Sequence, residues 1–411
     1  MKLRGRRVLV AMYYLMIALG LSTLMSCSGV SSNSFGHPSN GTGSGTTSGT
    51  SQFLYTANQA SNTISGFQIN NDGTLTALAD SPFTAASPAS SLSVANSSLL
   101  LGGCNPDGNC GLSLYSIASQ SGILNPASSV STSGSFSAVL DPSAGSVYAT
   151  GGTQSTPNGT VSGFSITGGS FSPLPGSPYV FSISNGSNPV TSGPIALDPS
   201  GKFLYMGSIT PQNEHTPAGS FGMALRNNDG SLSGFTTATG CITAGSVAVA
   251  AESGSSIVYA SCVDDWSGMY WIASLIVDSS TGNPTSATGF VSPDSNELLL
   301  GLAVDPSGKW LAVTDVNNNL VHVMSINPAT GALSDSPDHI FPTGTAPNAV
   351  AFDHTGKFLY VTNGGYRFSG LTGSNNISGF TFDSSNGMLT PLPGSPYAVG
   401  QAPSAIAVAQ P

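Results

Sequence analysis

The chain has 411 residues, of which only 7% are charged and 51 are glycine. This length allows a large core or several domains, and the composition is typical of either a disordered chain or an all-β protein. Nine Lys and Arg stand against 19 Asp and Glu. Because no basic stripe is present, the chain lacks the charge that binding to a phosphate backbone requires. We therefore expect no nucleic-acid partner.

The first 26 residues have the order of a secretory signal peptide. Four basic residues precede the apolar run Val8–Leu21, which is too short and too close to the N-terminus for a membrane span. The run leads into L-M-S-C at residues 24–27, which resembles a bacterial lipobox, in which the cysteine is acylated after cleavage. An ordinary signal peptide with a stray cysteine is the alternative. Acyl chains on Cys27 would anchor the protein to a membrane.

The segment after this cysteine extends the prediction of an envelope protein. Ser28 resembles the residue that lets a lipoprotein leave the inner membrane, so we expect an outer-membrane lipoprotein, facing the periplasm or the cell exterior. Residues 27–51 are almost all Ser, Gly, Thr and Asn and read as a flexible tether.

Four further cysteines form an even set, as expected in an exported protein. Cys104 and Cys110 flank the turn-prone N-P-D-G-N, and Cys241 and Cys262 are the other natural pair. Both disulfides fit an oxidising compartment. Metal binding is the competing interpretation, but no cysteine pair has zinc-knuckle spacing with a histidine partner. The sequence thus predicts two disulfides and no metal or cofactor.

One hairpin recurs along the chain. Its clearest copy is F-D-H-T-G-K-F-L-Y-V-T-N at residues 352–363, where the turn Asp353–Gly356 separates two apolar runs. The position of Tyr360 recurs at intervals of about 46 to 57 residues, which is the spacing of propeller blades. The seven copies are marked by Tyr55, Leu101, Tyr148, Tyr205, Tyr259, Ala312 and Tyr360.

After the hairpin of strands A and B, each copy continues with two further segments, strand C and strand D. I-S-G-F begins at Ile64 and Ile377, V-S-G-F begins at Val161, and P-L-P-G-S-P-Y begins at Pro173 and Pro391. Each copy is therefore a four-stranded meander, with strands A to D. A single sheet cannot bury both its faces, whereas seven packed radially can. We predict an all-β protein whose residues 52–411 form one seven-bladed β-propeller.

The two ends of this domain predict how the ring closes. The first copy begins at Phe53 with strand B and has no strand A before it. Residues 403–409, P-S-A-I-A-V-A, match the strand A of the last copy. The C-terminal strand is therefore expected to pair into the first blade.

These repeats resemble the Y-V-T-N repeat of bacterial surface propellers. The wider pattern of D-P-S-G-K, F-L-Y-V-T-N and I-S-G-F resembles the lactonase-type propeller family related to phosphogluconolactonase, over about residues 52–410. The resemblance implies a propeller fold and, as an activity, the opening of a lactone. Family lactonases carry Pro-His pairs and an Arg or Glu where strand A begins. Four such positions in this chain, residues 87–89, 192–194, 346–348 and 402–404, have no histidine.

The B–C and D–A loops of a propeller emerge on one face, which we call the loop face, and the A–B and C–D turns form the opposite turn face. Long loops on a rigid scaffold are where binding usually resides. Both predicted disulfides map to the loop face, and Arg367 is one of only two Lys or Arg beyond the signal peptide that fall outside the repeated turn. The distinctive residues of the B–C loops are Glu214, His215, Asp264, Asp265, Trp266, Tyr366 and Arg367.

Two functions remain open from the sequence. The first is a lipid-anchored, non-catalytic and monomeric propeller that binds a glycan, peptide or protein through Asp264, Asp265, Trp266, Tyr366 and Arg367, with the aromatic rings as stacking surfaces. The second is an exported lactone hydrolase with Glu214, His215 and Arg367 as catalytic candidates, since the reaction needs a general base and a donor to the oxyanion. The lack of histidine at the four strand A starts favours the binding role.

Two features have a simpler interpretation beside the functional one. Polar residues in loops are commonly just solvated, and this applies to Glu214, His215 and the Asp264–Asp265 pair. D-V-N-N-N at residues 315–319 resembles a calcium loop but lacks its glycine and its distal acid. We expect a B–C turn there.

Overall fold

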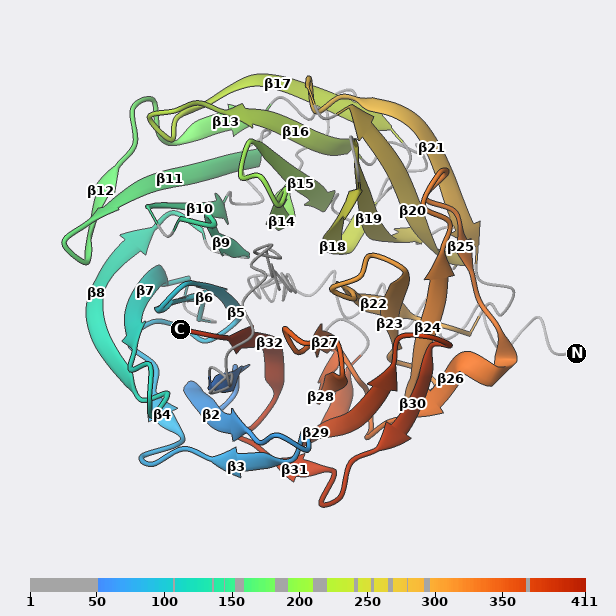
Figure 1. Ribbon diagram of the computed structural model, residues 1–411. Coiled ribbons are helices and arrows are strands. Elements are labelled where there is room, and N and C mark those ends of the chain that lie inside the picture. Colours follow the sequence, from blue (N-terminus) through green and yellow to red (C-terminus); the bar gives the residue numbers. More distant parts are fainter. Residues whose placement is uncertain are drawn as a thin grey trace, which may run out of the picture.

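The computed structural model describes residues 51–411 except 106–107, 135–136, 144, 152–158, 182–190, 210–219, 240–242, 253–254, 265–268, 279, 292–295 and 367–369. The described chain is all-β apart from the single-turn 3-10 helix η1 (Pro337–His339). Its strands form seven antiparallel sheets arranged as a ring (Figure 1). The predicted seven-bladed propeller is confirmed. Among the described residues, no helix has the length and apolar character needed to cross a membrane.

The strands follow the predicted A-to-D order in each blade. Blade one contains β32 (Pro403–Ala409), β1 (Gln52–Asn58), β2 (Thr63–Ile69), β3 (Leu75–Ala77) and β4 (Phe83–Thr84). Blade two contains β5 (Ser91–Ala95), β6 (Ser98–Cys104), β7 (Cys110–Ile117) and β8 (Leu124–Thr132). Blade three contains β9 (Ala138–Leu140), β10 (Ser146–Gly151), β11 (Gly159–Thr167), β12 (Ser170–Pro173) and β13 (Tyr179–Phe181). Blade four contains β14 (Thr191–Leu197), β15 (Phe203–Ile209), β16 (Ser220–Arg226) and β17 (Leu232–Thr239).

The remaining three blades complete the ring. Blade five contains β18 (Thr243–Glu252), β19 (Ser255–Asp264), β20 (Met269–Asp278) and β21 (Pro284–Val291). Blade six contains β22 (Leu299–Val304), β23 (Trp310–Asp315), β24 (Leu320–Ile326), β25 (Leu333–Ser334) and β26 (Ile340–Pro342). Blade seven contains β27 (Ala349–Phe352), β28 (Phe358–Tyr366), β29 (Leu371–Asp383), β30 (Met388–Pro391) and β31 (Tyr397–Ala398).

The ring closes as the sequence predicts. β32, the last strand of the chain, pairs antiparallel with β1, the first described strand, with Leu54 opposite Val408. The two strands share blade one, with β32 innermost (Figure 1). Both ends of the domain are thereby held in one sheet, which removes two exposed sheet edges.

The aspartate of the repeated turn organises the turn face. Asp353 is fully buried, and its Oδ1 accepts hydrogen bonds from the backbone N–H groups of Lys357 and Phe358, both at 2.8 Å. Its Oδ2 accepts from the N–H of Thr355 at 3.0 Å and from Gln52 Nε2 at 3.1 Å. An Asp side chain can replace backbone partners in this way at a tight turn. Asp141, Asp198 and Asp305 are buried in the equivalent turns.

The tyrosine that marks each hairpin joins neighbouring blades. Tyr360 is fully buried in blade seven, and its hydroxyl donates to the carbonyl of Gly73, in the C–D turn of blade one, at 2.7 Å. Tyr55, Tyr148 and Tyr259 make the same bond to Gly122, Gly230 and Gly331. The Tyr205 hydroxyl is buried without a hydrogen-bond partner. The recurrence of the tyrosine thus reflects a contact between blades.

The two repeated motifs of strands C and D fit one another. A Cβ on Gly379 of I-S-G-F would lie 3.1 Å from both the Leu392 and the Tyr397 side chains of P-L-P-G-S-P-Y, so a larger residue would crowd both side chains. The N–H of Gly379 donates to Ser395 Oγ at 3.0 Å. This motif divides strand D into two short strands, β30 and β31, which both pair with β29.

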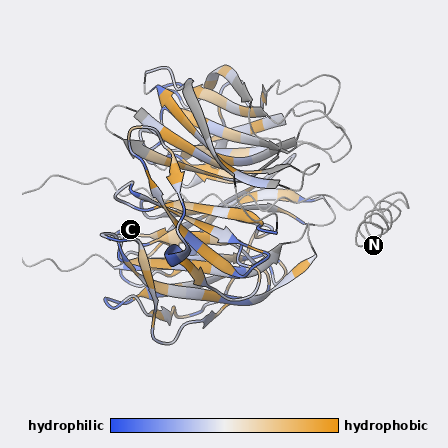
Figure 2. Cartoon of the chain, turned by 90° about the vertical axis from the view of Figure 1, so that its right-hand side faces the viewer, coloured by the Kyte–Doolittle hydropathy of each residue, from blue (hydrophilic) through white to orange (hydrophobic). Residues whose placement is uncertain are grey.

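The core is divided among the contacts between blades. One buried apolar cluster lies between each pair of neighbouring blades, around the ring from blades one and two to blades seven and one. Apolar residues accordingly follow the strands through the depth of the ring (Figure 2). Burial of apolar area between blades is the main stabilising contribution in such a fold.

Candidate functional site

The structure corrects the placement of two predicted loop residues. Asp264 is the last residue of β19 and pairs with Met269, and Tyr366 is the last residue of β28 and pairs with Leu371. Both stand in strands because these B–C hairpins continue their pairing beyond the length that the repeat indicates. Glu214, His215, Asp265, Trp266 and Arg367 lie outside the described residues, as do Cys27 and Cys241.

The first predicted disulfide is confirmed. Cys104 and Cys110 are bonded, and they stand directly opposite one another at the ends of β6 and β7. Cys262 is also disulfide-bonded. The Cys104–Cys110 bond fixes the B–C hairpin of blade two at the loop face.

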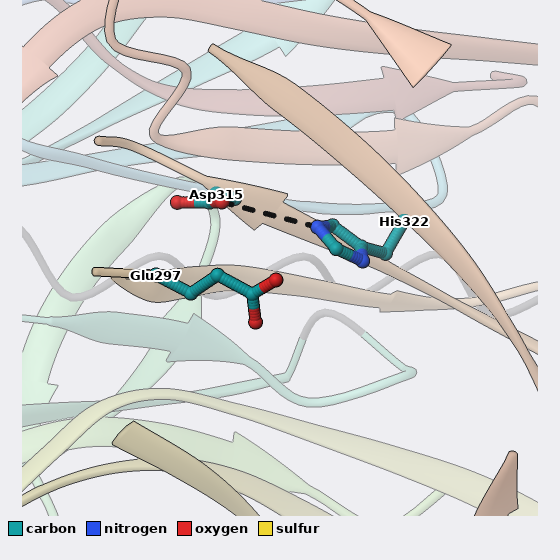
Figure 3. A group of neighbouring side chains, drawn as sticks. All are labelled: Glu297, Asp315 and His322. Atoms are coloured by element: carbon teal, nitrogen blue, oxygen red, sulfur yellow. Dashed lines mark ion pairs between the residues drawn. The ribbon is translucent and has the colours of Figure 1, made fainter. Parts of the chain in front are cut away.

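Blade six brings together a group of acidic and imidazole side chains, which we call the blade-six cluster: Glu297, Asp315 and His322 (Figure 3). Glu297 stands two residues before the innermost strand β22, Asp315 ends β23, and His322 lies in β24. One ligand-type atom from each residue lies within 4.8 Å of the other two.

Strand alternation explains why these side chains meet. Val313 packs in the buried cluster between blades five and six, and Asp315, two residues later, projects to the same side. His322 stands directly opposite Val313, so it also points toward blade five. Asp315 and His322 have no exposed side-chain surface. Glu297 keeps part of its surface exposed, although the three ligand atoms form a buried group.

The cluster is anchored by hydrogen bonds from two sides. Asp315 Oδ1 accepts from the N–H of Leu298 at 3.1 Å, and Oδ2 accepts from Asn318 Nδ2 at 2.7 Å. His322 Nδ1 lies 2.9 Å from Asp335 Oδ2, whereas Nε2 lies 3.9 Å from Asp315 Oδ2 and has no hydrogen-bond partner.

The ionisation of this group reflects its burial and its charges. Burial alone would lower the pKa of His322, but its contacts with Asp315 and Asp335 and the charge of Glu297 raise it to about 9. Burial alone would raise the pKa of Asp315, but its interaction with His322 and its hydrogen bonds hold that pKa below the usual value. A carboxylate–imidazole network of this kind can hold a proton or a cation.

The sequence reasoning missed Glu297 and gave His322 no role. The start of strand A in blade six is N-E-L at residues 296–298, without the proline that marks the four starts that the sequence analysis compared. A search of every strand A start for a carboxylate would have found Glu297. The D-V-N-N-N segment forms the expected B–C turn, with Asn319 at a φ of 61°.

Lysine and arginine side chains are confined to the turn face in the described part of the chain. Lys202, Lys309 and Lys357 directly precede strands β15, β23 and β28, in the A–B turns. Arg226 ends β16 and forms an ion pair with Asp141 at 2.6 Å. Of the five Lys and Arg beyond residue 26, only Arg367, between β28 and β29 in the chain, belongs to a B–C connection.

Comparison with known proteins finds similarity in sequence over part of the chain and in fold over most of it. No family model matches the chain. The chain is similar to the 6-phosphogluconolactonase of Blochmanniella pennsylvanica, with 32% identity over 105 residues, which span 26% of this chain and 28% of that protein.

Solved structures extend the likeness to the whole ring. A 6-phosphogluconolactonase, described as putative, from Bacteroides uniformis superposes with a TM-score of 0.68 at 14% identity, over 88% of this chain and 100% of that one. The periplasmic gluconolactonase of Pseudomonas aeruginosa superposes with a TM-score of 0.66 at 16% identity, over 88% and 100%. The fold is that of the lactonase-type propellers. The resemblance that the repeats indicate is therefore confirmed.

Proposed function

We propose that the protein is an exported lactone hydrolase that acts on the loop face. The observation that carries this proposal is the 32% identical match to a 6-phosphogluconolactonase within a ring of the lactonase type. Fold alone would be weak support, since one fold hosts many functions. The local sequence match adds support for the activity that the fold alone does not give.

The reaction requires two groups from the protein, and the loops supply candidates for both. Water attacks the lactone carbonyl carbon and a general base takes the proton of that water. The ring C–O bond then breaks as the base returns this proton to the leaving oxygen, which gives a carboxylic acid and a hydroxyl. Glu214 or His215 is the proposed base. Arg367 is the proposed donor to the oxyanion, because a fixed cation stabilises charge that develops in the transition state.

The distribution of charge supports an unphosphorylated sugar lactone as the substrate. A phosphorylated substrate carries two additional negative charges, which proteins usually hold with Arg or Lys. The four described Lys and Arg belong to the turn face, and the acids outnumber the bases overall. Long-range electrostatics would therefore disfavour a phosphosugar.

Export and anchoring form part of the same proposal. The Cys104–Cys110 disulfide fits an oxidising compartment, and Cys27 is the proposed site of acylation. A Cys27→Ser variant is expected to leave the membrane fraction of the producing cells and to lose incorporation of labelled fatty acid. If the variant stays in the membrane fraction and still incorporates labelled fatty acid, the lipid anchor is contradicted. This result would not bear on the proposed activity.

Hydrolysis is tested with the purified mature protein. Glucono-1,5-lactone, 6-phosphogluconolactone and a non-sugar lactone are supplied at mildly acidic pH, and acid release is followed against the spontaneous rate. We expect kcat/KM for the unphosphorylated sugar to exceed that for the phosphosugar by about tenfold. A preference for the phosphosugar would refute the substrate class, and no rate above the spontaneous one with any lactone would refute the activity.

A further inference from the structure

We propose that Glu297, Asp315 and His322 bind a divalent transition-metal ion of the Zn²⁺ class, between blades five and six (Figure 3). This proposal does not depend on lactone hydrolysis. It concerns a buried group that the proposed reaction does not use, because Asp315 and His322 have no exposed surface with which to touch a substrate.

The orientation of His322 is the observation that points to a ligand. In the neutral ring, the form that binds a metal ion, an Nδ1 that donates to Asp335 at 2.9 Å leaves the lone pair on Nε2. This atom is buried, lacks a hydrogen-bond partner, and faces Asp315. Metal-binding histidines nearly always donate the other ring N–H to a carboxylate, a backbone carbonyl or a water, which fixes the tautomer. A buried imidazole nitrogen without a partner is otherwise costly.

Asp315 is held in place independently of any ion. The N–H groups of Leu298 and Asn317 donate to its Oδ1 at 3.1 and 3.2 Å, and Asn318 Nδ2 donates to its Oδ2 at 2.7 Å. Each carboxylate oxygen accepts more than one partner, so Oδ2 retains capacity for a cation. The ligand is thus positioned by the B–C turn and by the residue that precedes β22.

The distances fit a small cation better than a hydrogen bond. Nε2 and Oδ2 are 3.9 Å apart, too far for a hydrogen bond. Two ligands that each lie about 2.0–2.2 Å from a tetrahedral Zn²⁺ are separated by about 3.3–3.6 Å. The three ligand atoms lie within 4.8 Å of one another, so small inward shifts of these side chains would bring them to the separations found around such an ion.

The chemistry of the donors selects the class of metal. Imidazole nitrogen with two carboxylates suits Zn²⁺ and its transition-metal neighbours. Ca²⁺ and Mg²⁺ prefer oxygen ligands alone. In addition, three carboxylates, those of Glu297, Asp315 and Asp335, surround one imidazole ring. A protonated ring would neutralise only one of these carboxylates, whereas a divalent ion compensates two.

The ion would join three successive segments of blade six. It would link Glu297, which precedes β22, to the end of β23 and the middle of β24, close to the loop face. We therefore expect it to stabilise blade six in the way that a structural site does, rather than to activate water.

The test is a calorimetric titration of the full mature protein, after dialysis against a chelator, with ZnCl₂, MnCl₂ and CaCl₂ separately. We expect one equivalent of Zn²⁺ with a Kd below about 10 µM, much weaker Ca²⁺ binding, and a higher Tm in the presence of Zn²⁺. Binding of Zn²⁺ that is weaker or not stoichiometric would overturn the proposal and leave a proton as the occupant. Tighter binding of Ca²⁺ than of Zn²⁺ would overturn the class of metal.

Matched variants locate the ion. His322→Gln and Glu297→Gln should each weaken Zn²⁺ binding by at least about 100-fold, and Asp335→Asn should weaken it by about 10- to 100-fold because it acts through His322. His354→Gln, at a partly buried histidine in the A–B turn of blade seven, should bind as the wild type does. Unchanged binding in Glu297→Gln and His322→Gln would overturn the site. If these variants do not fold, anomalous diffraction from Zn²⁺-soaked wild-type crystals decides, because the proposal requires a peak among the three side chains.

Discussion

The turn face and the loop face of the ring are stabilised in different ways. On the turn face, the same contacts recur from blade to blade: a buried aspartate in the A–B turn and a tyrosine hydroxyl bonded to the next C–D turn. On the loop face, each blade differs. Blade two carries the Cys104–Cys110 disulfide, and blade six carries the blade-six cluster.

The difference shows where the repeat ends and individual chemistry begins. Residues that recur satisfy buried backbone groups and join blades, so they define the scaffold. Residues that occur once are not needed for the ring to close, which leaves them available for function. If this division holds, substitutions in the repeated turns should reduce stability more than substitutions in the loops.

The largest effect is expected at the turn face. Asp353→Ala removes the acceptor of the Lys357 and Phe358 N–H groups and of Gln52, in a fully buried turn. Leaving these donors unsatisfied should lower the free energy of unfolding by about 3 kcal/mol, measured by urea denaturation. Asp72→Ala, in an exposed turn, serves as the control and should cause no comparable loss. Equal losses in the two variants would contradict a special role for the buried turns.

The loop-face disulfide should contribute somewhat less. Replacing both Cys104 and Cys110 by Ser opens a short loop and should lower the free energy of unfolding by about 2 kcal/mol. Chemical reduction of the disulfides in the wild type should lower the free energy of unfolding by at least as much, because Cys262 is also disulfide-bonded. Wild-type stability in the double variant would show that the B–C hairpin is held by its strand pairing alone.

Two tyrosines test the contact between blades, because the hydroxyl of only one of them donates a hydrogen bond to the next blade. Tyr360→Phe loses the hydrogen bond to Gly73 and should lower the free energy of unfolding by about 1 kcal/mol. Tyr205→Phe removes a buried hydroxyl that has no partner, so it should be neutral or stabilising. The reverse ranking of the two would contradict the proposed link between blades.

The smallest effect is a pH dependence at the ring closure. Burial lowers the pKa of His354, and its hydrogen bond to the Val408 carbonyl and the charge of Asp353 only partly oppose this. The folded pKa therefore lies below the unfolded value of about 6.5. Above about pH 6.5 the His354 imidazole is neutral in both the folded and the unfolded state. Below it, the unfolded state takes up more protons, so the free energy of unfolding falls as the pH drops through about 6.5.

His354→Gln retains a donor for Val408 and removes the titration. We expect its stability to decline less than that of the wild type between pH 7 and pH 5, measured by urea denaturation at each pH. Parallel curves for the two proteins would assign the pH dependence to other groups.

The scaffold is predictable from the sequence because it is repeated. Tyr360, Asp353 and the glycine of I-S-G-F each recur in several blades, so their spacing predicts the ring. The match of residues 403–409 to a strand A predicts its closure. The blade-six cluster is not predictable in this way. Glu297, Asp315 and His322 meet only through strand register and the packing of blade six against blade five, and Asp335 reaches His322 from a separate segment.

The central claim is that the loop face acts on a substrate while the turn face only supports it. The most direct test is kcat/KM for glucono-1,5-lactone in Arg367→Ala beside Lys357→Ala, since each removes one cation from a different kind of connection. The account predicts a fall of at least about tenfold for Arg367→Ala, because a donor to the oxyanion is lost, and wild-type activity for Lys357→Ala. Equal activity in the two variants, or a larger loss in Lys357→Ala, would contradict it.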